Sequence, residues 1–121
     1  MAEVSLDKSG LTKVDVTGNK TLAAADGGIV QNVTVDGKVV TLPATAVGDV
    51  FIVRVADFGV GVQVAPNSAD QIAGLGFTAT DNKAAILASD NARAGDFLEL
   101  VADGAAGWHV VRASGAWTRA A

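Results

Sequence analysis

Cysteine is absent from the 121 residues of the chain, so disulfide bridges, thiolate metal sites and cysteine nucleophiles are excluded. Tyrosine is also absent, tryptophan occurs twice, and the single histidine is His109. Metal sites need clusters of histidine or carboxylate ligands at defined spacings, whereas the aspartates of this chain are spread one per turn. We therefore expect neither a metal ion nor a cofactor.

Charged residues are also scarce in this chain. Charged residues make up 18% of the chain and hydrophobic residues 50%, whereas typical soluble domains contain about 25% charged residues. A small domain has a large surface for its volume, so this composition favours covering part of the surface with other copies of the chain or with a larger assembly. The alternative is that the excess consists of alanine and valine, which are tolerated singly at a surface. We expect a homo-oligomer, preferably a trimer, with a dimer as the alternative.

Basic stripes and long apolar segments are missing as well. The nine basic residues are scattered from Lys8 to Arg119 with no interleaved aromatic stripe, which argues against a nucleic-acid partner. The N-terminus lacks a basic segment followed by an apolar one, and the longest strongly apolar run, Val50–Val53, is too short to cross a bilayer. We expect no membrane partner, and we expect synthesis in the cytoplasm.

What the chain does contain is aspartate and glycine at regularly placed turns. Eleven of the thirteen acidic residues are aspartate, which favours turns, whereas glutamate favours helices. One pattern of turns occurs twice, each time around a short apolar stretch. Its two copies are Gly48-Asp49 with Ala56-Asp57, and Gly95-Asp96 with Ala102-Asp103.

The two copies predict two β-hairpins, formed by residues 49–56 with 60–65 and by residues 96–102 with 108–114. A third hairpin is expected at Asp36-Gly37, because Asp-Gly between two β-branched runs favours a type I′ turn. The predicted fold class is all-β: a small antiparallel β-sandwich or barrel built from two similar hairpin or meander halves. The alternative explanation of the repeat is convergence of turn residues.

Three further segments complete the predicted organisation. Residues 21–28 indicate one helical turn closed by glycine, with Leu22 as its apolar anchor. Residues 81–89 contain good helix formers, but their position relative to the second Gly-Asp turn favours a short strand over a helix. Residues 1–20 are polar and are interpreted as an extended N-terminal arm, followed by a single β domain over residues 21–121.

No catalytic constellation is apparent, and we expect the protein not to be an enzyme. Asp49 and Asp96 begin equivalent strands, so one hypothesis is a carboxylate pair for sugar hydrolysis. The simpler interpretation is that each aspartate forms hydrogen bonds within its own turn. His109 lies in a predicted strand beside Trp108 and is interpreted as a surface or packing residue.

Five residues are candidate contacts with other copies of the chain or with a partner. Arg54 and Glu99 interrupt apolar strands at related positions, which indicates either two side chains that extend to solvent or a buried pair that determines register. Lys8 and Lys13 belong to the predicted arm. Trp117 lies near the C-terminus, outside the predicted hairpins.

Two stretches of turn and core residues form recognisable patterns. They are Thr21-Leu22-x-x-x-Asp26-x-Gly28 with Val33 and Val40-Thr41-Leu42-Pro43, and Gly95-Asp96-x-Leu98-x-Leu100-Val101-Ala102-Asp103-Gly104 with Gly107-Trp108-x-Val110 and Ser114-Gly115-x-Trp117. Together they resemble a β-rich module of tailed-bacteriophage virion proteins, most closely that of small head decoration (cement) proteins. The resemblance covers about residues 20–118.

The resemblance implies a capsid decoration protein that binds the outside of the phage head and stabilises it by bridging capsomers. The implied partners are other copies of the chain and the major capsid protein, and the implied location is the capsid surface of the virion. The arm is expected to make contacts, so deleting residues 2–18 should weaken capsid binding and leave the β domain folded. The alternative function is a receptor- or glycan-binding module of a phage tail or baseplate.

The composition predicts a solution mass near three times the 12.1 kDa of one chain. Self-association would explain how a domain with so little charge stays soluble. Size-exclusion chromatography with light scattering measures this mass. A protein that stays monomeric at high concentration would contradict this explanation and support a surface of harmless alanine and valine.

Overall fold

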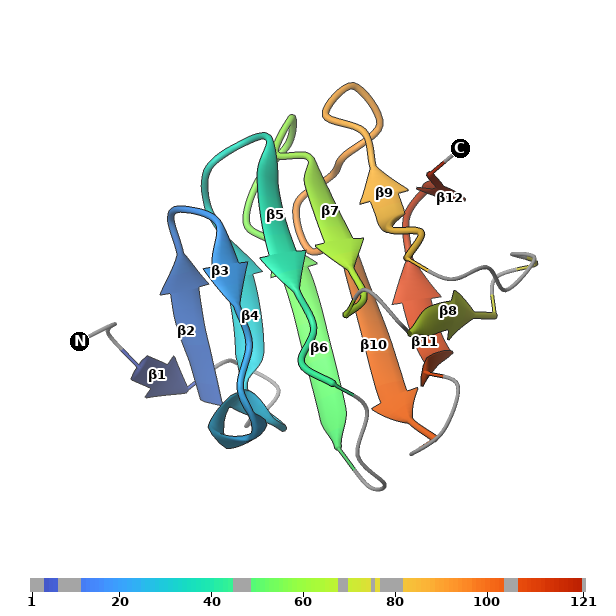
Figure 1. Ribbon diagram of the computed structural model, residues 1–121. Coiled ribbons are helices and arrows are strands. Elements are labelled where there is room, and N and C mark those ends of the chain that lie inside the picture. The colour runs from blue at the N-terminus through green and yellow to red at the C-terminus, as the bar shows by residue number, and fades with distance from the viewer. Residues whose placement is uncertain are drawn as a thin grey trace.

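The computed structural model describes residues 4–6, 12–44, 49–67, 70–74, 76, 82–103 and 107–120. In this part of the chain the protein consists of β-strands, one short 3-10 helix and connecting turns (Figure 1). The strands form two sheets packed face to face, and the smaller sheet lies in front of the larger one in Figure 1. The predicted all-β class and sandwich architecture are confirmed.

The large sheet has seven strands among the described residues. Their order across the sheet is β1 (Val4–Leu6), β2 (Thr12–Val16), β4 (Val30–Val33), β6 (Val50–Val55), β10 (Phe97–Ala102), β11 (Gly107–Ser114) and β8 (Gln71–Ala73). In the same part of the chain, the small sheet contains β12 (Trp117–Arg119), β9 (Ala85–Leu87), β7 (Val62–Ala65), β5 (Lys38–Thr41) and β3 (Lys20–Thr21). The 3-10 helix η1 (Ala24–Asp26) follows β3.

In the first half of the chain, successive strands alternate between the two sheets. β2, β4 and β6 are parallel neighbours in the large sheet, and β3, β5 and β7 are parallel neighbours in the small sheet. The chain therefore crosses the core at each turn and coils around it, in the manner of a short β-solenoid.

Two of the three predicted hairpins are therefore wrong. The turn at Asp36-Gly37 joins β4 of the large sheet to β5 of the small sheet, and the turn after Ala56 joins β6 to β7 in the same way. In each case the two strands supply buried side chains to the core from opposite sheets, as Val33 and Val40 do. A strand–turn–strand pattern is the same for a hairpin and for such an arch, so the local sequence does not distinguish them.

The third predicted hairpin is confirmed. β10 and β11 are antiparallel neighbours, with a shift in register between Glu99 and Leu100. Because the first copy of the turn pattern forms an arch and the second forms a hairpin, the two halves of the fold are not alike. The sheets are accordingly mixed, where the sequence predicted antiparallel pairing throughout.

The core lies between the sheets and contains two buried aromatic rings that contact each other. Phe51 of β6 and Trp108 of β11 are both buried, and their rings meet edge to face with centroids 5.3 Å apart. Around them pack the valines and leucines that alternate along β6, β7 and β10. This alternation leaves every second residue of the large sheet on its outer face.

The predicted N-terminal arm is also corrected in its described part. Residues 12–16 form β2, which pairs in parallel with β4. Val14 and Val16 are buried, and Val16 belongs to the core cluster. This segment is thus a strand of the β domain, because its backbone pairs with β4 and its alternating valines are buried.

Two shorter predictions are confirmed. The helical turn expected in residues 21–28 is η1, and Leu22 before it is buried in the core. The ambiguous stretch 81–89 contains β9, a strand between β7 and β12. Tertiary pairing on both sides outweighs the helix propensity of its alanines.

Because β2 is part of the large sheet, we no longer expect the β domain to keep its stability when residues 2–18 are deleted. Deletion of residues 2–18 should lower the free energy of unfolding by more than about 3 kcal/mol, because it removes two buried valines and the pairing partner of β4. Urea unfolding measures this change, with Thr17→Ala, an exposed position in the same segment, as the control. An unchanged unfolding midpoint in the truncated chain would restore the arm interpretation.

Candidate functional site

The outer face of the large sheet brings side chains from distant parts of the chain, most of them polar, into two adjacent rows. Side chains on neighbouring strands align because the strands are in register, and every second residue points outward. One row consists of Asp15, Asn32, Arg54, Phe97 and Ser114. The next row consists of Lys13, Val30, Ile52, Glu99 and Arg112.

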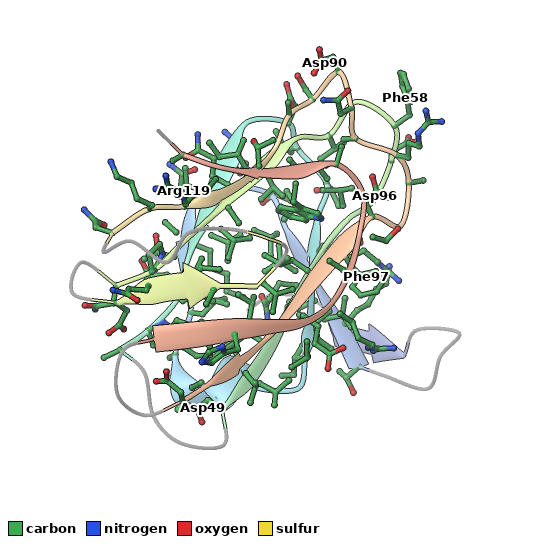
Figure 2. All side chains as sticks on the ribbon, turned by 90° about the vertical axis from the view of Figure 1, so that its right-hand side faces the viewer. Asp49, Phe58, Asp90, Asp96, Phe97 and Arg119 are labelled. Atoms are coloured by element: carbon green, nitrogen blue, oxygen red, sulfur yellow. The ribbon has the colours of Figure 1, made fainter. Side chains whose placement is uncertain are left out.

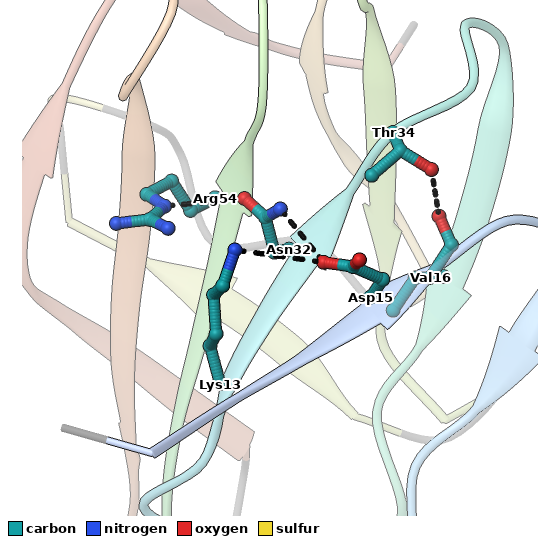
Figure 3. A network of polar contacts seen from close by, with 6 residues as sticks. All are labelled: Lys13, Asp15, Val16, Asn32, Thr34 and Arg54. Atoms are coloured by element: carbon teal, nitrogen blue, oxygen red, sulfur yellow. Dashed lines mark hydrogen bonds and ion pairs between the residues drawn. The ribbon is translucent and has the colours of Figure 1, made fainter. Parts of the chain in front are cut away.

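Asn32 of β4 connects its neighbours in the first row (Figure 3). Its Nδ2 donates a hydrogen bond to Oδ1 of Asp15 at 3.0 Å, and its Oδ1 accepts one from Nε of Arg54 at 3.2 Å. The side chain uses donor and acceptor together, although Asn32 is only 4% exposed. The amide therefore sets the direction of both charged groups.

Lys13 completes what we call the Asn32 network, formed by Lys13, Asp15, Asn32 and Arg54. Its Nζ lies 3.8 Å from Oδ1 of Asp15, the same oxygen that accepts from Asn32 (Figure 3). The network holds two cations and one carboxylate, so its formal charge is positive in a chain whose net charge is −4.

A backbone contact aligns the strands beneath this network. The carbonyl oxygen of Val16 accepts a hydrogen bond from the backbone N–H of Thr34 at 3.0 Å and another from its hydroxyl at 3.4 Å. These bonds extend the pairing of β2 with β4 beyond the end of the strand (Figure 3). Lys13 and Asp15 are thereby held on a rigid sheet.

A second polar group lies beside the network, on β10 and β11. Nη2 and Nε of Arg112 donate to Oε1 of Glu99 at 2.6 and 2.8 Å, and the Arg112 guanidinium lies 5.7 Å from the centre of the Phe97 ring. Arg112 is exposed, so this ion pair adds little to stability. The ion pair does neutralise Glu99, which lies in the row beside that of Arg54.

The predicted contact residues are therefore only partly brought together. Lys13 and Arg54 meet in the Asn32 network, while Glu99 lies in the next row with Arg112 as a partner. The pairing described for Arg54 is with Asn32, a residue that the sequence analysis did not single out. The signal was an asparagine, beside Gln31, in a short strand flanked by valines.

The position of Trp117 differs from the expectation that it contacts another copy of the chain or a partner. Its side chain is 8% exposed and belongs to the core cluster, and its Nε1 donates to the carbonyl oxygen of Ser114 at 2.9 Å. Trp117 therefore packs β12 against the core and does not offer its ring to a partner. Lys8 lies outside the described residues.

A hollow adjoins the Asn32 network. It is lined by Lys13, Asn32, Arg54, Val55, Ala56, Ala94 and Gly95. It thus lies over β2, β4 and the end of β6, beside the loop that precedes β10. We call it the Arg54 hollow, since the two cations of the network line it together with apolar side chains.

Asp49 and Asp96 do not form a catalytic pair. Each precedes its strand, but β6 and β10 are antiparallel, so the two residues lie at opposite ends of the sheet (Figure 2). Six residues of strand separate them by roughly 17 Å or more, beyond the spacing of about 5–10 Å used in glycoside hydrolysis.

Asp96 has the structural role that the simpler interpretation assigned to it. It is 6% exposed, and its carboxylate accepts hydrogen bonds from the backbone N–H of Arg93 at 3.1 Å and from the hydroxyl of Ser114 at 3.3 Å. It thus ties the turn before β10 to the end of β11. A Cβ on Gly115 would lie 2.7 Å from Oδ2 of Asp96, so glycine is needed beside it.

The remaining candidates for chemistry are few. His109 is exposed, and its Nε2 lies 3.4 Å from Oδ2 of Asp103 in the β10–β11 hairpin. Among the described residues, no three histidine, aspartate or glutamate side chains lie close enough together to hold a metal ion. Within the same residues, no helix has the length and apolar character needed to span a membrane.

Asn32→Ala should lower the free energy of unfolding by about 1–3 kcal/mol, because it removes two side-chain hydrogen bonds and leaves their charged partners half-buried. Chemical denaturation with urea measures the loss. Asn91→Ala, in an exposed turn, is the matched control and should change stability by less than about 0.5 kcal/mol. Equal midpoints for the two variants would contradict the role given to Asn32.

Comparison with known proteins yields no family model, no curated protein and no solved structure that matches this chain.

Proposed function

We propose that this protein is a binding and structural module of a tailed-bacteriophage particle, specifically a capsid decoration protein. It binds the outside of the assembled head and bridges neighbouring capsomers. The observation that carries the proposal is the Asn32 network on the large sheet, because it presents ordered charges on a rigid surface. The pattern of turn and core residues in the sequence supplies the phage context.

The proposed mechanism is thermodynamic and involves no chemical step. A protein that binds only the assembled shell stabilises the shell by mass action, by an amount that grows with the logarithm of its free concentration relative to its Kd. Rigid strands favour this role, because little conformational entropy is lost when a preformed face docks. The network is built from β2, β4 and β6, which pair directly with one another.

The alternative function is recognition of a receptor or glycan by a phage tail or baseplate. One observation favours it: Phe58, in the turn between β6 and β7, is 72% exposed and projects from the molecule (Figure 2). An exposed aromatic ring suits stacking on a sugar or packing against a receptor. The burial of Trp117 removes the other ring that such a site would use.

The test is binding to purified phage heads that lack their decoration protein. The wild-type chain should sediment with expanded heads, reach a fixed ratio to the shell protein and raise the temperature at which heads rupture by several degrees. Unexpanded heads from the same phage are the control for recognition of the assembled state.

The tail alternative is tested in parallel with host cells and a glycan array. Binding there that disappears in Phe58→Ala, together with no binding to heads, would overturn the decoration proposal. Phe58 is exposed, so its replacement should leave the fold intact.

A further inference from the structure

A polar contact joins the two sheets near the edge of the sandwich. Nζ of Lys20, on β3 of the small sheet, donates a hydrogen bond at 2.8 Å to Oε1 of Gln31, on β4 of the large sheet. Gln31 is fully buried, whereas the Lys20 side chain is 29% exposed. The amine therefore reaches inward from the edge strand of one sheet to an amide that is covered by the other.

The strand register explains why both side chains point toward the core. Gln31 is paired with Val14 and Val53, which are both buried. Lys20 is paired with Val40, a buried residue of the core cluster. Residues paired across neighbouring strands share a face of the sheet. The amide of Gln31 is thus held among apolar side chains and shielded from water.

A carboxylate lies beside the amine. Oδ1 of Asp26, in η1, is 3.8 Å from Nζ of Lys20, and its Oδ2 accepts a hydrogen bond at 2.8 Å from the backbone N–H of Ala23. Nε2 of Gln31 donates to the carbonyl oxygen of Ile29 at 3.3 Å, so the amide is also oriented. An amine, an amide carbonyl and a proton acceptor are therefore gathered in one place, and these are the groups that amide exchange requires.

The amine is within reach of the amide carbon. Because a C=O bond is about 1.2 Å long, Cδ of Gln31 lies no more than about 4.0 Å from Nζ of Lys20. Reacting groups held about 3–3.5 Å apart behave as if present at about 10⁵ M or more. Rotation about the terminal bonds of the partly exposed Lys20 side chain supplies the remaining approach.

We propose that Lys20 and Gln31 join in an intramolecular isopeptide bond. The Nζ–Cδ bond forms and the Cδ–Nε2 bond breaks. The Lys20 ammonium gives up two protons. Asp26 accepts one of them and passes it to Nε2, which leaves as ammonia, and the other goes to water. No atom is oxidised or reduced, no further reactant is needed, and the inference does not rest on the proposed function.

The bond links the two sheets covalently. It closes residues 20–31, including η1, into a loop, which restricts the unfolded chain and so stabilises the folded one. β3 has only two residues, Lys20 and Thr21, so its pairing with β5 offers few backbone hydrogen bonds. A covalent link at Lys20 therefore anchors the weakest edge of the small sheet.

The first experiment is mass spectrometry of the purified, denatured wild-type chain. Its mass should be about 17 Da below the value calculated from the sequence, because one ammonia is lost. Trypsin cleaves an unlinked chain after Lys20 and yields peptides 14–20 and 21–38. The bond blocks that cleavage, so a single peptide 14–38, lighter by the same mass, should replace them. The full calculated mass with cleavage after Lys20, or a mass deficit outside this peptide, would overturn the proposal.

The second experiment separates the bond from the ion pair. Lys20→Arg keeps the positive charge but has no primary amine, so its mass should equal the calculated value. Lys38→Arg, on β5 of the same sheet, is the matched control and should keep the deficit. Lys20→Arg should also melt roughly 5–10 °C below Lys38→Arg, because the closed loop is lost. A mass deficit that persists in Lys20→Arg would overturn the assignment of the bond.

The third experiment tests the proton acceptor. Asp26→Asn retains an oxygen that can accept from the backbone of Ala23, so η1 should still form. The lighter species should accumulate at least about tenfold more slowly than in wild type, because the proton transfer is no longer assisted. Intact masses recorded at intervals after synthesis measure both rates. Accumulation at the wild-type rate would overturn the role given to Asp26.

Discussion

The apolar contact between the two sheets is the interaction on which the rest of the structure depends. Phe51 and Trp108 of the large sheet meet within it, and valines and leucines from both sheets belong to the same cluster. Each sheet has one apolar face that is stable only when the other sheet covers it. The crossings from sheet to sheet in the first half of the chain meet this requirement. Each arch supplies one strand to each sheet, whereas a hairpin supplies both of its strands to the same sheet.

The outer surface of the large sheet follows from that packing. When alternate residues of β2, β4 and β6 are committed to the core, the residues between them must face outward. Parallel pairing in register then aligns Asp15, Asn32 and Arg54, although they are far apart in the sequence. Their hydrogen bonds are a consequence of the register and also reinforce it. The Asn32 network thus depends on the packing of the sandwich core.

The contrast between the two copies of the turn pattern shows how far local sequence is informative. Both copies form a strand, a turn and a second strand, and the second forms the expected hairpin between β10 and β11. The first forms an arch, because Val62 and Val64 of its second strand pack into the core from the small sheet. The alanine-rich segment at β9 was ambiguous for a similar reason: its neighbours β7 and β12 decide its conformation.

The sequence by itself determined the all-β class, the positions of most strands and turns, and the absence of thiol chemistry, since these depend on residue type and on short-range alternation. It also identified Lys13 and Arg54 as notable charges. Only the tertiary structure decided that β2 belongs to the core, that Trp117 is buried and that Asn32 connects Asp15 to Arg54. The physical reason is that strand partners and register are chosen by contacts between residues remote in sequence. A local sequence pattern therefore does not determine which strands pair or in which register.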